Sequence, residues 1–554
     1  MIKKLFIGVS VSTVALVTFT QHSFAESPEL FTSDKEIEST LKRFRENSIE
    51  FMNELPKKYD GNGNPVTINT SPYFDAQNIT LKYFVTNKDN ERAKLPVVLS
   101  DGSVVPLKSL GERAGIESND QAKVIAELPE KPSTRELEAI RRRDPERLKN
   151  LKYFITTLSE MDEKKLLQSS LEEKNAPWSD DYWPIYKGQL ADRYSFSENN
   201  PNNNWKKNKE HFLKYKDSFR DSTSLDDLSP AEKYDLLVGD VSESFTNYMW
   251  NQGEYYFKHS QAAEDSEKVE TWMGICHGWA PAAYMLPRPE NAVSVVAADG
   301  ITKLKFYPSD IKALGSQLWA TARTGSLFIG GRCNQKDPKK DKNGRVLDQD
   351  CFDNNPGAWH LSVVNRIGVK QKSFVIDATY DYEVWNQPVF KYKYTYFNPQ
   401  TGKRAKSLES ATVSLNEYTN DKFKNHRDPN STSVVGVVME LTYVVETRPT
   451  HFSKDSFAQD AHRTATYIYD IELNRDGEII GGEWYQNTHP DFLWTPATGA
   501  VASAPGDRYI RTSWDGTTAL PSDWKNGAYR SSPYGLPLGS VVNTLITLSK
   551  ISGE

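Results

Sequence analysis

The spacing of apolar residues changes along the chain from a helical period to the alternation of strands. Near the N-terminus, Leu41 and Phe44 recur at helical spacing within a charged segment, as they do in an amphipathic helix. Further on, apolar residues flank Asp101-Gly102, a dipeptide that favours a hairpin turn. The predicted helices of this part span residues 26–54, 133–142 and 145–170, and its predicted strands span 79–85 and 95–99.

The middle of the chain contains one helix with a strong start signal and one that carries a cysteine. Residues 229–232 place serine at the N-cap, proline at the first helical position and an acid at the third. Within 271–286, glycines and a tryptophan lead into Cys276, and small and apolar residues follow in a helix-like run. Since proline is harmless only in a first helical turn, Pro281 predicts that this helix begins at or after His277.

After this stretch the pattern is rich in strands. One more helix is expected from the N-cap pair at 309–310 to about Arg323. The predicted strands span 293–296, 303–307, 357–367, 373–378, 434–445, 465–473 and 478–485. Helices mixed with hairpin-connected strands predict an α+β fold with an antiparallel sheet.

The length of 554 residues predicts two or three domains, and a hydrophobic content of 38% is enough for substantial cores. Aromatic residues and prolines crowd into residues 176–194, so we place a boundary near Lys174. Residues 26–174 form an ordinary N-terminal domain of helices and strands, a removable pro-segment or a regulatory domain. Residues 175–433 form a core around Cys276, and residues 434–554 form a β-rich part packed on that core.

Residues 1–25 have the pattern of a signal peptide. Lys3 and Lys4 precede an apolar run, and small residues stand at the cleavage positions 23–25. The apolar run is short for a spanning helix, and no later stretch could span a bilayer. We therefore expect a secreted chain, or a periplasmic one in a host with two membranes. Removing the two lysines changes the formal net charge from −6 to −8, which argues against a nucleic-acid partner.

The three cysteines are expected to form one disulfide and one free thiol. Cys333 and Cys351 flank a polar loop, and closing it would contribute about 3 kcal/mol in the chain-entropy model. Cys276 then remains free. A helix N-terminus lowers the pKa of a thiol and favours the thiolate. The pattern therefore indicates a nucleophile for acyl transfer, although a lone buried cysteine is more often structural.

The strands predicted at 357–367 and 373–378 supply partners for this thiol. With a tight turn between them, His360 and Asp377 project to the same face as diagonal neighbours. The carboxylate would then orient the imidazole, which completes a triad with Cys276. A register slip of one residue would place the two side chains on opposite faces.

Several alternatives to this triad remain open. His360 is equally well explained as a buried structural residue. Asp381 is the second choice for the carboxylate, and His277 is expected to have a structural or supporting role beside the cysteine.

Several segments of the chain resemble the transglutaminase elicitor family. They are residues 272–280, 330–333, 355–360 and 377–380. The most specific piece is 384–389, which is similar to the start of the surface peptide through which plants sense oomycete cell-wall transglutaminases. The chain departs from that peptide after Val389. The resemblance covers residues 176 to about 485, and the style of the signal peptide indicates a bacterial member.

This resemblance implies a papain-like, transglutaminase-like core and protein-glutamine γ-glutamyltransferase activity on protein substrates, without an organic cofactor. Carried onto this chain, Cys276 forms a thioester with a glutamine side chain, and a lysine amine converts the thioester to an isopeptide bond. His360 and Asp377 fill the positions of the general base and its orienting group. The backbone N–H of Cys276 and the indole of Trp272 or Trp279 are candidate oxyanion donors.

Family members are often calcium-dependent, and one segment has much of an EF-hand loop pattern. In residues 472–483, glycine is sixth and glutamate is twelfth. The strand-like flanks favour a β-hairpin over an EF-hand. The candidate calcium ligands are Glu472, Asn474, Asp476 and Glu483. A second acidic loop at 341–350 is expected to be only solvated.

Two other functional classes fit the same residues. A cysteine hydrolase, either a protease or a glutamine deamidase, would use the same triad and pass the acyl group to water. Exclusion of water from the acceptor site separates the two enzymes. The third class is a secreted surface protein in which Cys276 has lost its function.

Overall fold

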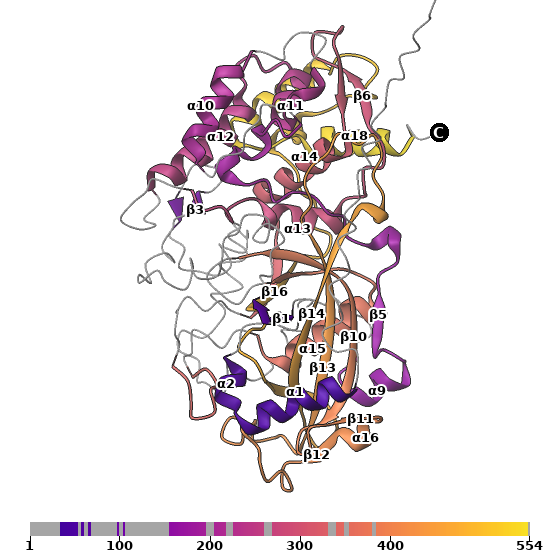
Figure 1. Cartoon of the computed structure of the whole chain (residues 1–554). Helices are drawn as coiled ribbons and strands as arrows, with labels where there is room; N and C mark the ends of the chain where they lie inside the picture. The colour runs from indigo at the N-terminus through magenta and orange to yellow at the C-terminus, as the bar shows by residue number, and fades with distance from the viewer. Residues whose placement is uncertain are drawn as a thin grey trace, which may run out of the picture.

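Figure 1 shows the computed structural model of the chain, with most helices gathered at one end and a large antiparallel sheet at the other. The structure describes residues 34–53, 57–59, 65–67, 97–98, 104–105, 154–195, 204–217, 225–259, 269–330, 339–347, 354–378 and 384–551. The predicted signal peptide, the predicted Cys333–Cys351 disulfide and Asp381 lie outside these residues. So do the elements predicted at 79–85 and 133–142.

The sheet has three long central strands: β10 (Asn386–Asn398), β13 (Ser433–Val445) and β14 (Ala461–Leu473). Its strands follow the order β15-β14-β13-β10-β9-β16-β8, and every neighbouring pair is antiparallel. The shorter strands of this order are β15 (Ile479–Trp484), β9 (Val375–Asp377), β16 (Phe492–Pro496) and β8 (Ser326–Gly330), of which β15 and β8 lie at the two ends. Short strands β5 (Gln168–Ser170), β11 (Lys403–Ala405) and β12 (Thr412–Ser414) pair with β10 or β13. The α+β class with an antiparallel sheet is therefore confirmed.

The helical end is built mainly from segments on both sides of the sheet in sequence (Figure 1). It contains α10 (Trp205–Tyr215), α11 (Pro230–Val238), α12 (Ser244–His259), α13 (Cys276–Met285), α14 (Pro308–Thr321), α17 (Ser522–Tyr529), α18 (Gly539–Ile551) and the hairpin β6 (Val293–Val296)–β7 (Lys303–Phe306). The predicted capping box of α11 is present, with Ser229 and Glu232 each accepting the other's backbone N–H. A fully buried ion pair, Lys233–Asp310 at 2.7 Å, joins α11 to α14.

The N-terminal helices α1 (Asp34–Glu46) and α2 (Ser48–Met52) pack against the sheet, on residues that come much later in the sequence. The Phe44 ring stacks on Phe423 and on Tyr485, with centroids 6.0 and 4.2 Å away. Two small hairpins follow, β1 (Lys57–Tyr59)–β2 (Pro65–Thr67) and β3 (Val97–Val98)–β4 (Val104–Val105). The second of these places a strand pair on either side of the turn predicted at 101–102, and the turn residues themselves lie outside the described residues.

Residues 145–153 of the helix predicted over 145–170 lie outside the described residues. Within 154–170 the prediction is wrong except at α9 (Leu158–Glu163), and residues 168–170 form β5. The cause is tertiary, because β5 pairs with the middle of β10. A strand partner more than 200 residues away thus overrides the local pattern.

The sheet also runs across the boundary that we placed between residues 433 and 434. Strand β10, on one side of it, pairs along most of its length with β13, on the other. Residues 522–551 then return to the helical end as α17 and α18 (Figure 1). In the described part of the chain, no helix combines the length and the apolar character needed to cross a bilayer.

Candidate active site

Cys276 is the first residue of α13, at the junction between the helical end and the sheet (Figure 1). The segment before it is fixed to Tyr182, whose carbonyl accepts the N–H of Ile275 at 2.7 Å. Gly274 is required here, since a Cβ at that position would lie 2.3 Å from the Tyr182 carbonyl oxygen. The helix therefore begins one residue earlier than predicted, and Pro281 lies inside it.

Asn386, at the start of β10, holds the thiol from the sheet side. Its Nδ2 donates to Cys276 Sγ at 3.5 Å, and its Oδ1 accepts the indole N–H of Trp494 at 2.8 Å. The thiol also lies 3.7 Å from the carbonyl oxygen of Val384. The contact with Trp494 thus fixes the orientation of the Asn386 amide, so that its N–H group points at sulfur. From the sequence we identified residues 384–389 as a family motif but assigned Asn386 no role.

Two buried carboxyl groups adjoin this pair. Asp377 on β9 is the register partner of Asn386, and its Oδ1 accepts the Trp385 N–H at 3.0 Å. Glu446 follows the last residue of β13, and its Oε1 accepts Gln387 Nε2 at 2.6 Å. The structure therefore brings Cys276 and Asp377 together, as the sequence predicted.

The electrostatics of the thiol differ from the expectation. Burial raises the pKa of Cys276 to about 12, the hydrogen bonds from Asn386 lower that pKa, and the charges of Glu446 and Asp377 raise it further. The lowered pKa expected from the helix N-terminus is thus wrong for this state, because desolvation of the thiolate outweighs the helix dipole. The resting thiol is protonated at neutral pH.

His360 lies in a different environment from the one predicted. The strand at 357–367 is wrong, because this segment forms α15 (Pro356–Val363) and then a π-helix, η7 (Val364–Val369). Asn355 caps α15 by accepting the Gly357 N–H at 2.8 Å. All eight residues of α15 are buried, so the segment lacks the polar face that marks a surface helix. The hairpin that would have paired His360 with Asp377 does not exist.

The contacts of His360 place it well away from the thiol. Its Nδ1 is 2.8 Å from the Tyr469 hydroxyl, and its ring packs edge-on against Tyr394 at 4.7 Å. Tyr394 is eight positions beyond Asn386 on β10, which is roughly 26 Å along a strand. His360 and Cys276 therefore do not form a catalytic pair in this structure.

Neither predicted indole is free to serve as an oxyanion donor. The Trp272 indole donates to the Glu270 carboxyl, and the Trp279 indole donates to the Trp178 carbonyl at 3.0 Å. His277, beside the cysteine, hydrogen-bonds the backbone of Ala320, and burial lowers its pKa to about 4. The donors that remain at the thiol are Asn386 Nδ2–H and the Cys276 backbone N–H, which has no acceptor within its own helix.

The calcium candidates lie on a hairpin, as the strand-like flanks predicted. Strands β14 and β15 pair, and Asn474 holds the turn between them by accepting the N–H groups of Asp476 and Glu478. The other two candidates are engaged elsewhere: Glu483 binds the Arg345 guanidinium through both oxygens, and Glu472 accepts from Ser431 and from a backbone N–H. Among the described residues, no group of three His, Cys, Asp or Glu side chains is arranged to hold a metal ion. The calcium requirement stays a prediction.

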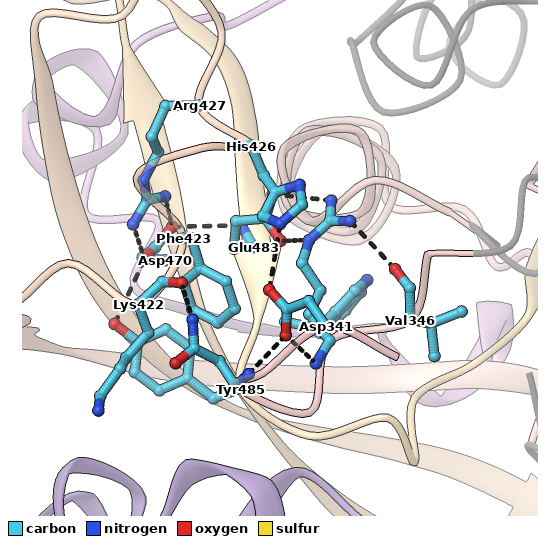
Figure 2. A network of polar contacts seen from close by, with 12 residues as sticks. Asp341, Val346, Lys422, Phe423, His426, Arg427, Asp470, Glu483 and Tyr485 are labelled. Atoms are coloured by element: carbon cyan, nitrogen blue, oxygen red, sulfur yellow. Dashed lines mark hydrogen bonds and ion pairs between the residues drawn. The ribbon is translucent and has the colours of Figure 1, made fainter. Parts of the chain in front are cut away.

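Figure 2 shows that this region is instead a network of ion pairs. The Arg427 guanidinium bridges Asp470 and Asp421, with the Arg427–Asp470 contact at 2.6 Å. Asp341 accepts from His426 at 3.2 Å and caps the backbone of residues 343 and 345. Asp341 of the acidic loop that we expected to be solvated is therefore bound to His426, in the segment between β12 and β13.

Comparison with known proteins adds a family match to this geometry. The model of a family described as "Transglutaminase elicitor" matches residues 147–505. The crystal structure of the GP42 transglutaminase from Phytophthora sojae aligns with a TM-score of 0.47 and 21% identity, over 75% of this chain and 100% of that one. No curated protein matches the chain. The family match spans Cys276, Asp377, Asn386 and Glu446.

Proposed function

Because the chain belongs to the transglutaminase elicitor family, we propose that it is a protein-glutamine γ-glutamyltransferase with Cys276 as its nucleophile. One observation carries the assignment to this thiol. Cys276 is a free cysteine at the first residue of a helix, and a side-chain amide donates to its sulfur. Donors that face sulfur stabilise negative charge as it develops there and on the neighbouring oxyanion.

The proposed reaction has two acyl-transfer steps. The thiolate attacks the side-chain amide carbon of a glutamine residue, and the N–H groups of Asn386 and Cys276 stabilise the oxyanion. The C–N bond then breaks, and the thiol's proton leaves with the nitrogen as ammonia. In the second step a lysine amine attacks the thioester, the C–S bond breaks, and the amine's surplus proton returns to sulfur.

Asp377 supports the first step by holding the strand segment of Asn386 in place. Its carboxylate accepts the Trp385 N–H and thereby fixes the strand segment that carries Asn386. We assign His360 no part in this reaction, because its contacts lie with Tyr469 and Tyr394. The nucleophile on the first turn of a helix that packs against β10 supports a papain-like arrangement as part of the proposal. The pattern of residues 1–25 supports secretion.

The test follows incorporation of a fluorescent primary amine into a glutamine-rich protein, with ammonia release measured in parallel. We expect the wild type to incorporate the amine and Cys276→Ala to lose both signals while keeping its unfolding midpoint. Parallel reactions with calcium and with a chelator measure the metal requirement.

The other outcomes are equally informative. Ammonia release or chain cleavage without incorporation would show a hydrolase, and incorporation by Cys276→Ala would remove this thiol from the mechanism. A folded His360→Asn variant is expected to keep its incorporation, since this residue does not reach the thiol. Its loss of activity would contradict the distance argument above.

A further inference from the structure

Two acceptor oxygens beside the thiol have no hydrogen-bond partner. They are Oε2 of Glu446 and Oε1 of Gln387, on side chains that are 3% and 1% exposed. The two side chains are bound to each other through their remaining polar atoms, Gln387 Nε2 and Glu446 Oε1, at 2.6 Å. A buried acceptor without a donor costs about 1–3 kcal/mol, so a pair of them indicates a ligand that supplies donors.

These oxygens belong to the site of Cys276. Gln387 follows Asn386 on β10, and Glu446 lies one residue beyond β13, which pairs with β10. The charge of Glu446 raises the pKa of Cys276, which places the two groups close together. The N–H of Thr447, the residue after Glu446, donates to the Asp180 carbonyl at 2.9 Å. This bond holds the end of β13 against the segment that contains Tyr182.

The surroundings of these oxygens are aromatic and contain two carboxylates and one cation. The charge of Asp181 raises the pKa of Glu446 and the charge of Arg463 lowers it. The charges of both carboxylates act on Tyr182. The rings of Tyr182 and Trp385 lie 5.2 Å apart and give an apolar wall. Within the described residues no set of side chains fits a metal ion. Negative charge, unpaired acceptors and an aromatic wall together match a nitrogen cation on a methylene chain.

We propose that Glu446 and Gln387 form the binding subsite for the acceptor amine, so that the substrate class of the second step is a primary alkylamine such as a lysine side chain. This inference rests on the proposed acyl transfer at Cys276. An ammonium ion supplies N–H donors to both free oxygens, and the Tyr182–Trp385 wall contacts its methylene groups.

The same contact prepares the amine for attack. An ammonium group has no lone pair, so one of its protons must leave before nitrogen can bond to the thioester carbon. Above about pH 8, where Glu446 is ionised, its carboxylate takes that proton and becomes a neutral carboxyl. Burial raises the pKa of Glu446 to about 8, which makes it a stronger base than an exposed carboxylate and brings its titration near neutral pH.

The test measures the KM for n-pentylamine, with a glutamine-containing peptide as acyl donor, in wild type and Glu446→Gln. We expect the KM to rise at least tenfold in the variant, and the wild-type change of kcat/KM near pH 8 to disappear. Glu440→Gln is the matched control, because Glu440 lies on β13, six residues before Glu446, and is half-buried. Its KM should equal that of the wild type. An unchanged KM in a folded Glu446→Gln protein would overturn the proposal.

A second measurement separates this inference from the proposed function. n-Pentylamine is titrated calorimetrically into Cys276→Ala and into Cys276→Ala with Glu446→Gln, where no chemistry occurs. We expect at least tenfold weaker binding to the double variant. Equal binding overturns the subsite, whereas weaker binding in a protein whose wild type releases no ammonia overturns only the acyl transfer. If Glu446→Gln fails to fold, Gln387→Leu replaces it, with an expected loss of at least threefold.

Discussion

Replacing Asn386 with leucine tests the site most directly, because this side chain contacts both the thiol and the sheet. The substitution keeps the approximate volume of the side chain but removes the donor to Cys276 Sγ and the acceptor for the Trp494 indole. Loss of one preorganised donor to an oxyanion typically lowers kcat by about 10²–10³-fold, or roughly 2.7–4 kcal/mol. We therefore expect kcat/KM for ammonia release to fall by a factor in this range.

The same substitution has a separate effect on stability. The Trp494 side chain is buried, and its indole N–H would lose its acceptor, Asn386 Oδ1. An unsatisfied buried donor costs about 1–3 kcal/mol, so the free energy of unfolding in guanidinium should fall by this amount. Both quantities are measured on one protein preparation, ammonia release below the unfolding transition and unfolding by Trp fluorescence.

Trp494→Phe is the matched control for this experiment. It removes the indole donor but leaves the Asn386 amide beside sulfur, so we expect a similar loss of stability and a fall in kcat/KM of no more than about tenfold. If folded Asn386→Leu keeps kcat/KM within threefold of the wild type, the amide does not assist the chemistry. Equal losses of activity in the two variants would mean that the orientation of the amide, and not its N–H, is what matters.

Three further predictions follow from buried groups elsewhere in the molecule. Burial raises the pKa of Cys276 to about 12. Iodoacetamide at pH 8 should therefore alkylate this residue roughly 10³-fold more slowly in the folded than in the denatured chain, as measured by mass spectrometry of the peptide that contains it. Equal rates would contradict the burial of the thiol. Either Lys233→Met or Asp310→Asn should lower the free energy of unfolding, measured in urea, by about 3–5 kcal/mol, because each leaves a fully buried charged partner unpaired. The double variant Lys233→Met with Asp310→Leu should recover much of this loss. A loss below 1 kcal/mol in both single variants would refute the prediction. In the folded state Glu446 keeps its proton up to about pH 8, whereas in the unfolded state it loses the proton above its ordinary pKa. The free energy of unfolding that Glu446 contributes should therefore fall as the pH rises from about 4.5 to 8, by roughly 1.4 kcal/mol per pH unit. The Glu446→Gln variant should lack this slope, so the difference between the wild-type and variant stability curves should change with pH over this range. Parallel curves would contradict the assignment.

Sequence reasoning located those parts of the site that have a local pattern. The position of Cys276 followed from the glycines before it and the small residues after it, and the β14–β15 hairpin followed from its strand-like flanks. Asp377 lies near the thiol, but the strand that carries it pairs with β10 and β16 and not, as predicted, with residues 357–367. Short-range patterns sufficed where the partner was a few residues away.

The failures have one physical cause, which is burial on all sides. Helix α15 has no exposed residue, so its apolar run reads like a core strand, and only the Asn355-Pro356 start distinguishes it. Asn386 and Glu446 meet Cys276 from 110 and 170 positions away, and no pattern within either segment announces that contact. The raised pKa of Cys276 likewise follows from the desolvation that the full fold imposes.

The packing of α1 has a consequence for how the chain matures. Its Phe44 is synthesised 441 residues before Tyr485, on which it stacks. At about 5–20 residues per second, the apolar side of α1 leaves the ribosome roughly 20–90 seconds before the strands that cover it are complete. During that interval Ile37, Leu41 and Phe44, buried in the finished molecule, have no native surface to cover them. Native burial of this helix therefore waits until the part of the sheet that packs on it has been synthesised.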